Sequence, residues 1–385
     1  MSYFVLPQIN YIIDSNNLEL SIGKSKNIIN KSLFNYLNEM KGQIDNYSIH
    51  WDIYKKYTNT YEYIHTVIPH TKHSVSKLKP LSRSFYKLIE IYNLLNLQFK
   101  EKEIQTFHLA EGPGGFIEAI LQLRGNKNDK YYGITLIDDD ENIPGWKKSK
   151  YFLSKHQNVY IEKGFDETGN LLNVDNLRYC YNKYKNSMEL ITGDGGFDFS
   201  INFNKQESLS IKLIFCQICY AIALQKEGGT FIIKIFDVFT EATIDLIYLL
   251  SSLYQKVYII KPCTSRIANS ERYIVCKNFK QNNIENLLEK LISFFPIINS
   301  DKKIKRFLNI DIPYIYINKL EDINAIMGQQ QIENILGTLY LLDNNKQDKI
   351  ELTRKTNIRK CIQWCIKHKV PYNQNIQQLN MFLPT

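Results

Sequence analysis

Three ionisable residues in the middle of the chain stand inside or at the ends of apolar runs. Asp194 ends the run ELITGD, Lys234 lies within TFIIKIF, and Glu271 opens ERYIVCK. A buried ammonium group is costly unless it is paired, and its pKa shifts readily, which suits proton transfer. Taken singly, Lys234 also fits an edge strand whose lysine reaches water, and the two acids fit a turn and a surface position. Together the three residues predict a site for acid–base chemistry.

A glycine-rich turn, in the run FHLAEGPGGF, follows an apolar strand pattern and precedes a helical one. Gly112, Gly114 and Gly115 permit a sharp turn and a close approach to a ligand, and the helix N-terminus that follows can receive an anion. Ile117 stands where a dinucleotide fingerprint needs a small residue, which disfavours NAD. Glu111, just before the glycines, is placed to bind the amino group of a methionine moiety. The alternative is a tight turn without a ligand.

Two further acids follow the next predicted strands. Asp138 comes after YYGITLI, and Asp166 comes after VYIEKGF. Carboxylates at such positions bind ribose or adenosine in doubly wound folds. Each of these two residues also fits a solvated turn, so both readings stay open.

The pattern around these residues alternates short apolar runs with helical segments, which is typical of an α/β fold with a largely parallel sheet. The connection 262–271 is too short for a parallel crossover, so the last strand is expected to run antiparallel. The sequence therefore predicts a doubly wound, Rossmann-like sheet of seven strands. The predicted strands are 106–111, 131–138, 159–162, 189–193, 230–236, 257–261 and 272–277. Helices are predicted at 81–97, 115–123, 207–224 and 241–254.

Extensions are expected on both sides of this sheet. Residues 1–70 form an N-terminal extension with little pattern, 71–280 the Rossmann-like domain, and 281–385 a helical C-terminal extension. Three segments of this last part have a helical pattern. They are 284–295, 323–342 and 359–367.

The composition is that of an ordinary folded protein. The chain has 385 residues, of which 44% are hydrophobic and 23% charged, which excludes a disordered chain. The net charge of +9 favours polyanions as partners. Cys216 and Cys219 form a C-x-x-C pair within an apolar helix, where buried thiols are more typical than a zinc site. No signal peptide and no run of about 18 apolar residues is evident. We therefore expect a reducing intracellular location, the cytoplasm or the nucleus, and no membrane contact.

The segment KPCTSRIANSERYIVCKNFK resembles the Lys-Pro-x-x-Ser-Arg…Ser-Glu-x-Tyr block of the FtsJ-like RNA ribose 2′-O-methyltransferases. Together with GGTFIIKIFDVFTEATIDLIYLL it is most similar to the eukaryotic and large-DNA-virus mRNA cap 2′-O-methyltransferases. The resemblance covers about residues 75–280 and implies the methyltransferase form of the doubly wound sheet. The family's Lys-Asp-Lys-Glu tetrad maps directly onto Asp194, Lys234 and Glu271. The run RSFYKLIEI supplies Lys87 as the first lysine.

This resemblance implies S-adenosylmethionine as the cofactor and a ribose 2′-hydroxyl near the 5′ cap of mRNA as the target. Lys234 is expected to contact the hydroxyl and assist its deprotonation, Asp194 to hold Lys234, and Lys87 with Glu271 to orient the ribose. No metal is required by this mechanism. The expected cofactor-binding residues are Glu111, Gly112, Pro113, Gly114, Gly115, Phe116, Asp138, Asp166 and Asp194.

Capped mRNA and other capping or transcription proteins are the expected partners, and a viral factory or virion is the expected location if the chain is viral. The stretch 71–89 carries five basic residues and no acid, so it fits either a phosphate path or a solvated loop. Lys79, Arg83 and Arg266 are the predicted RNA-binding residues. Alternative functions are 2′-O-methylation of ribosomal or transfer RNA, and a catalytically silent RNA-binding scaffold.

Overall fold

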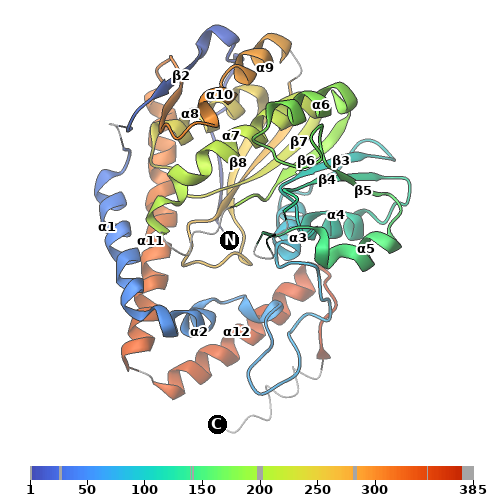
Figure 1. Ribbon diagram of the computed structural model, residues 1–385. Helices are drawn as coiled ribbons and strands as arrows, with labels where there is room; N and C mark the ends of the chain where they lie inside the picture. Colours follow the sequence, from blue (N-terminus) through green and yellow to red (C-terminus); the bar gives the residue numbers. More distant parts are fainter. Residues whose placement is uncertain are drawn as a thin grey trace.

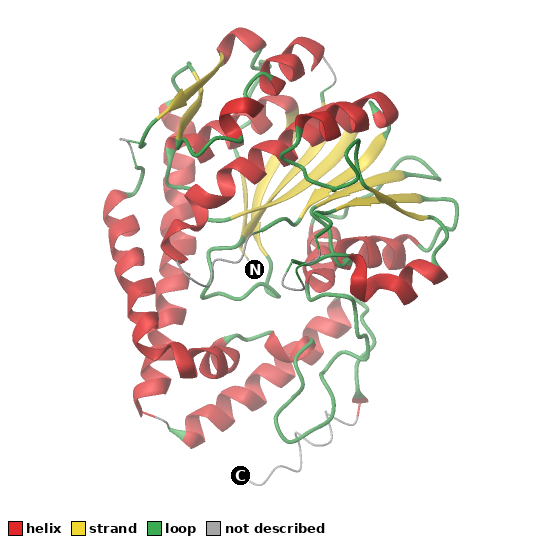
Figure 2. Ribbon diagram, viewed as in Figure 1, coloured by secondary structure: helices red, strands yellow, loops and turns green. Residues whose placement is uncertain are grey.

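A single eight-stranded sheet forms the centre of the protein (Figures 1 and 2). The computed structural model describes residues 2–25, 28–138, 140, 143–196, 203–280, 284–344 and 346–374. The strands of the sheet are β1 (Ser2–Val5), β3 (Gln105–Leu109), β4 (Lys130–Ile134), β5 (Val159–Glu162), β6 (Met188–Gly193), β7 (Gln225–Ile235), β8 (Tyr254–Lys261) and β9 (Arg272–Phe279). Their order across the sheet is β1-β8-β9-β7-β6-β3-β4-β5.

The strand directions confirm the predicted doubly wound topology. Strands β7, β6, β3, β4 and β5 pair in parallel, whereas β9 lies antiparallel between β7 and β8. The sheet therefore has six strands in one direction and two reversed strands, β9 and β1. One strand of this sheet was not predicted: β1 pairs antiparallel with β8, from Ser2 opposite Lys261 to Val5 opposite Tyr258. It belongs to the N-terminal extension, so this extension completes the edge of the sheet.

Helices cover both faces of the sheet, as Figure 2 shows. One face packs against α3 (Ser84–Leu94) and α4 (Gly115–Arg124). The other packs against α6 (Val174–Tyr184), α7 (Gln206–Leu224) and α8 (Glu241–Leu253). Side chains alternate between the two faces because successive strand residues point to opposite sides. Ile232 and Ile233 of β7, for example, belong to different core clusters.

Helix α7 is the one helix of the described ranges that is long and apolar enough to cross a membrane by composition. The sequence analysis predicted this helix, at 207–224, but did not count it as an apolar run of membrane length. In the fold 83% of its most apolar stretch is buried inside the protein, so it serves as a core helix. Cys216 and Cys219 lie fully buried on it, and each thiol is free.

The two extensions pack against each other and against the sheet domain. Their elements are β2 (Leu18–Ile22), α1 (Lys31–Gln43), α2 (Ser48–Thr58), α9 (Ile284–Ile292), α10 (Phe295–Ile298), β10 (Ile304–Leu308), α11 (Tyr314–Asn344) and α12 (Gln347–Lys367). The C-terminal part is mainly helical, as expected, but β10 is a strand that pairs with β2. Helix α11 runs beside α1, and α12 continues next to α2 (Figure 1). Lys41 of α1 reaches the sheet domain and pairs with the buried Asp237 at 2.8 Å.

A buried carboxylate on α8 attaches β10 to the sheet domain. Asp245 accepts hydrogen bonds from the Arg306 guanidinium at 2.8 and 3.1 Å and from the backbone amides of Phe307 and Leu308 at 2.8 and 3.1 Å. Its four hydrogen bonds satisfy donors that would otherwise be buried without partners.

Replacing Asp245 with alanine should lower the free energy of unfolding by about 3 kcal/mol, because a guanidinium and two amides lose their acceptor. Urea denaturation followed by circular dichroism measures this change. Asp322→Ala on α11 removes an exposed acid and should change the same quantity by less than about 0.5 kcal/mol. Equal losses in the two variants would contradict the anchoring role of Asp245.

Candidate active site

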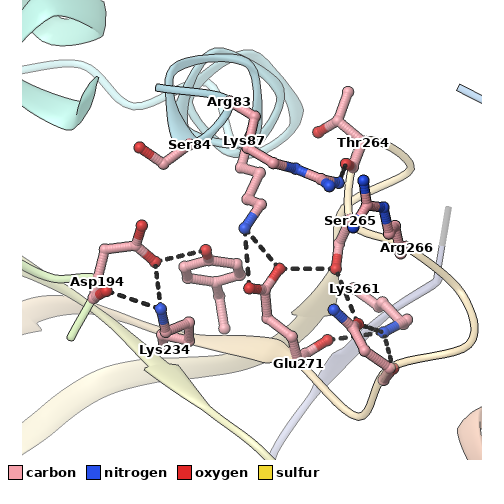
Figure 3. A network of polar contacts seen from close by, with 12 residues as sticks. Arg83, Ser84, Lys87, Asp194, Lys234, Lys261, Thr264, Ser265, Arg266 and Glu271 are labelled. Atoms are coloured by element: carbon pink, nitrogen blue, oxygen red, sulfur yellow. Dashed lines mark hydrogen bonds and ion pairs between the residues drawn. The ribbon is translucent and has the colours of Figure 1, made fainter. Parts of the chain in front are cut away.

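The four tetrad residues come together at one edge of the sheet (Figure 3). Asp194 directly follows β6, Lys234 lies near the end of β7, and Glu271 directly precedes β9. Because β9 runs opposite to its neighbours, its first residue meets the carboxyl ends of the parallel strands. Lys87 is supplied from α3, which packs on this part of the sheet. Residues far apart in sequence thus form one cluster.

Two lysine–carboxylate pairs make up this cluster. The Nζ of Lys87 lies 2.7 and 2.8 Å from the two carboxylate oxygens of Glu271. The Nζ of Lys234 donates to the backbone carbonyl of Asp194 at 2.7 Å and lies 3.4 Å from its Oδ1. The side chain of Lys234 is only 12% exposed, and β7 lies between two other strands. The alternative of a lysine on an edge strand is therefore wrong for Lys234.

Tyr273 connects the two pairs, and the sequence analysis missed it. Its hydroxyl donates to Oδ1 of Asp194 at 2.7 Å, and its ring lies 5.8 Å from the Nζ of Lys87. Burial raises the pKa of Tyr273, and the nearby charges of Asp194 and Glu271 raise it further. The signal was present in the sequence: Tyr273 lies two residues after Glu271, and side chains two apart on a strand point to the same face.

The carboxylate of Glu271 is held from several sides. Burial alone would raise its pKa, but the ammonium charges of Lys87 and Lys234, and the hydrogen bonds from Lys87 and Ser265, lower it well below its usual range. The Ser265 hydroxyl donates to the carboxylate at 2.7 Å. Lys261 donates to the backbone carbonyl of Glu271 at 2.8 Å, and burial lowers the pKa of Lys261 to about 7. The segment that contains these residues was singled out in the sequence, but their contacts were not.

Helix α3 presents one stripe of side chains to the loop 262–271. Arg83 donates to the carbonyl of Thr264 at 3.0 Å, Lys87 reaches Glu271, and Glu90 accepts from the backbone amides of Cys263 and Thr264 at 2.7 and 3.1 Å. Residues four and three apart share a helix face, so the three side chains act on the same loop. Burial lowers the pKa of Lys87, an effect that Glu271 opposes.

A second of the three predicted RNA contacts, Arg266, forms an internal ion pair, whereas the third, Lys79, is exposed. Arg266 donates to both carboxylate oxygens of the buried Glu62, with Nη2–Oε1 at 2.7 Å and Nε–Oε2 at 3.1 Å. Burial would raise the pKa of Glu62, but the hydrogen bonds and charge of Arg266 lower it. Arg83 and Arg266 thus fasten the loop that carries Ser265 and Glu271. Their contact with RNA stays a prediction.

The glycine turn is shaped by close packing. Gly114 has a φ of +108°, a conformation that favours glycine. A Cβ on Gly115 would lie 2.1 and 2.3 Å from the hydroxyl oxygens of Ser82 and Ser84, and one on Gly112 would lie 2.7 Å from the carbonyl of Pro144. These glycines are required for the turn to fit against α3 and the loop before η4 (Trp146–Ser149). Pro113 accepts a hydrogen bond from Ser149, and Phe116 is fully buried on α4.

Glu111 itself occupies the helix N-terminus that was expected to receive a ligand anion. Its Oε1 accepts from the backbone amides of Phe116 and Ile117 at 2.7 and 3.0 Å. Burial raises the pKa of Glu111 to about 8, and the negative charge of Asp194 adds to this shift. Within the described ranges no lysine, arginine or histidine forms an ion pair with Glu111. The turn therefore presents buried acidic groups that a cation would stabilise.

Asp138 and Asp166 lie in loops and not in the tetrad cluster. Strand β4 ends at Ile134, earlier than predicted, so Asp138 lies four residues into an exposed loop, where it accepts from the amide of Asp140 at 2.9 Å. The carboxylate of Asp166 accepts from Thr168, Asn173 and Asn176. Burial would raise the pKa of Asp166, but these hydrogen bonds lower it to about 2. Both residues follow strand ends, and their role toward adenosine stays a prediction.

Breaking the ion pair between Lys87 and Glu271 should destabilise the fold. Lys87→Met leaves the buried Glu271 carboxylate without its cation, which should lower the free energy of unfolding by about 3–5 kcal/mol at pH 7. In Lys87→Met/Glu271→Leu most of this loss should disappear. The pKa of Glu271 is lower in the folded protein than in the unfolded chain, where it is about 4.3. The ion pair therefore stabilises the folded state fully at pH values above about 4.3. This contribution is lost as the pH falls through the pKa that Glu271 has in the folded protein. Urea denaturation of the two single variants and the double variant measures these changes. If the losses in unfolding free energy of Lys87→Met and Glu271→Leu add up in the double variant, the two groups are not coupled.

Several curated proteins are similar to parts of this chain. It is 26% identical over 266 residues to cap-specific mRNA (nucleoside-2′-O-)-methyltransferase 2 of Drosophila melanogaster, covering 63% of this chain and 36% of that protein. It is 32% identical over 239 residues to cap-specific mRNA (nucleoside-2′-O-)-methyltransferase 1 of Mus musculus, covering 59% and 28%. The Caenorhabditis elegans protein of the latter name is 38% identical over 188 residues, covering 47% and 20%. The matches thus span roughly a third or less of these relatives.

Among solved structures, a putative ribosomal RNA methyltransferase from Plasmodium falciparum is 26% identical, with a TM-score of 0.37, and the match covers 52% of this chain and 98% of that one. A family model for FtsJ-like methyltransferases matches residues 80–279, which is more than half of the chain and includes all four tetrad residues. The chain therefore belongs to the FtsJ-like methyltransferase family.

Proposed function

We propose that this protein methylates a ribose 2′-hydroxyl near the 5′ cap of mRNA, with S-adenosylmethionine as the methyl donor that its family implies. One observation carries the proposal: Lys87, Asp194, Lys234 and Glu271 form a single buried set of ion pairs at the carboxyl edge of the sheet. A purely structural scaffold gains little from two buried lysines, which favours catalysis over the silent alternative.

The reaction needs the hydroxyl to be aligned and to lose its proton. The oxygen–methyl bond forms as the sulfur–methyl bond breaks, and the hydroxyl proton is released to solvent. Lys234 is the group placed to assist this step, because its ammonium, held by Asp194 and still partly exposed, would stabilise the negative charge that develops on the hydroxyl oxygen. Lys87 and Glu271 lie on the other side of Tyr273, where they orient the ribose. Positioning of this kind supplies a large part of the rate in group transfer.

The residues on the cofactor side fit a cationic ligand. Glu111 and Asp194 are two acidic groups near each other, and the negative charge of Asp194 adds to the effect of burial in raising the pKa of Glu111. S-adenosylmethionine supplies an activated methyl on a sulfonium and carries an ammonium group, so it brings positive charge to this place. The glycine turn 112–116 would hold its methionine part, and Asp138 with Asp166 its adenosine.

The assignment of a cap substrate rests on relatives. The proteins named above as cap-specific methyltransferases match 47–63% of this chain, although they are much longer than it. Methylation of ribosomal or transfer RNA would use the same tetrad. A comparison of RNA substrates therefore decides between these targets.

Lys234→Met should reduce kcat by about 10²–10⁴-fold, because the group that assists proton transfer is lost. The assay follows labelled S-adenosylmethionine into RNAs with a methylated cap, an unmethylated cap or a triphosphate, and identifies 2′-O-methyl ribose after nuclease digestion. Lys226→Met on the same strand, at its exposed start, is the matched control and should retain activity. Equal labelling of all three RNAs would reject the cap assignment and keep the reaction. No labelling with intact cofactor binding would reject the proposed reaction for the isolated chain.

Cofactor binding should depend on the ionisation of Glu111. Since a cation binds the carboxylate better than the neutral acid, the Kd for S-adenosylmethionine should fall as the pH rises from 5.5 to 7, by up to about tenfold per pH unit. Isothermal titration calorimetry measures this Kd. In Glu111→Gln the binding should be weaker and the pH dependence should vanish. A wild-type Kd that does not change over this range would contradict a direct contact with Glu111.

A further inference from the structure

A cavity of about 400 Å³ opens in front of α3, next to the tetrad. Four cationic side chains line it: Lys72, Lys77, Lys79 and Arg83. His65 and His73 line it as well, but burial lowers the pKa of His65 to about 3, so His65 carries no charge at pH 7. We call this cavity with these six residues the basic pocket. Its other lining residues are uncharged. A concave site with charge of one sign concentrates its electric field and attracts the opposite charge.

The exposed lysines of the basic pocket are not paired with acids. Across the described residues, no ion pair involves Lys72, Lys77 or Lys79, and all three are exposed. Arg83 forms the inner wall, where its guanidinium donates to the carbonyl of Thr264 and feels the charges of Glu62 and Glu271. Glu62 lies 3.8 Å from His65 of the pocket but is paired with Arg266. The three lysines thus lack an anion that would balance them.

The shape of the basic pocket is fixed by backbone hydrogen bonds. The amides of Val75 and Ser76 donate to the carbonyls of Tyr63 and Ile64 at 2.8 and 3.1 Å. Residues after α12 hold the other side of this loop: the amide of Lys77 donates to Pro371, and the amide of Asn373 donates to Val75, both at 2.9 Å. The C-terminal extension therefore completes the wall, and the lysines are presented by a preorganised loop.

The basic pocket and the tetrad share α3. Arg83 is the residue just before α3, and Lys87 lies four residues later on the helix, so both side chains lie on one helix face. Arg83 also contacts the loop that carries Glu271. An anion bound by Arg83 in the pocket would therefore lie about one helical turn along α3 from a ribose oriented by Lys87.

We propose that the basic pocket binds a phosphate group of the RNA substrate and so sets which ribose reaches Lys234. The inference rests on the proposed function and deepens it, because it assigns a specificity site and gives the C-terminal extension a role in building it. Two parts of the RNA offer this chemistry: a phosphodiester of the transcript and the triphosphate bridge of a cap.

The test compares two triple variants with the same change in charge. Lys72→Ala/Lys77→Ala/Lys79→Ala removes the exposed lysines of the pocket, whereas Lys302→Ala/Lys303→Ala/Lys305→Ala removes three lysines around β10 on the opposite part of the protein. The Kd for a capped oligoribonucleotide is measured over a series of salt concentrations. The pocket variant should weaken binding at least about tenfold and reduce the slope of log Kd against log salt by about two to three. The control should change neither quantity.

Lys72→Arg/Lys77→Arg/Lys79→Arg keeps the charge and should bind like the wild type, which separates lost charge from altered folding. An unchanged Kd and slope in the alanine variant would overturn the inference, whether or not wild type methylates RNA. A wild type that binds through the pocket but labels no RNA would reject the proposed function alone. Loss of binding to the cap dinucleotide assigns the triphosphate, and loss confined to the longer RNA assigns the phosphodiester. Binding of a phosphoserine peptide that is lost in the alanine variant, while RNA binding is kept, would overturn the choice of RNA.

Discussion

The burial of two ammonium groups at the carboxyl edge of the sheet is the constraint on which the rest of the site depends. Lys87 and Lys234 are tolerated because each has a carboxylate partner, and Tyr273 holds both pairs in one cluster. Meeting this constraint requires α3 to be docked on the loop before β9. Arg83 and Glu90, on the same helix stripe as Lys87, provide that docking through hydrogen bonds to the loop backbone.

Much of the fold was predictable because central strands of a parallel sheet are short, apolar and separated by helical patterns. The polar residues that interrupt these runs, Asp194 and Lys234, were visible for the same reason. Lys87 was different: a lysine on an amphipathic helix is ordinary, and only the family resemblance marked it. Tyr273 was missed because a tyrosine fits an apolar strand pattern, and its hydroxyl partner is set by long-range pairing. The short strand β1 has too few residues for a period to be read.

The glycine turn makes a contact that the sequence analysis did not predict. The sequence analysis expected the N-terminus of α4 to receive an anion of the ligand, by analogy with phosphate-binding turns. In the structure the carboxylate of Glu111 takes that position, so the helix amides are satisfied by the protein itself. The electrostatic preference of the turn is therefore reversed, from a site for anions to a site for a cation. A turn with this preference favours a positively charged methyl donor over a dinucleotide, whose phosphates are negative.

The interlocked extensions bear on how such a protein can change during evolution. The segment matched by the family, 80–279, holds all four tetrad residues but not all the partners of its charged groups. Asp237 is paired with Lys41 of α1, and it also lies 3.7 Å from Arg272. Arg266 is paired with the buried Glu62 of the N-terminal extension, and the buried Asp245 is paired with Arg306 of the C-terminal extension. Loss of either extension would therefore remove a charged partner from the catalytic segment. An exchange of either extension during evolution would call for compensating substitutions at these positions.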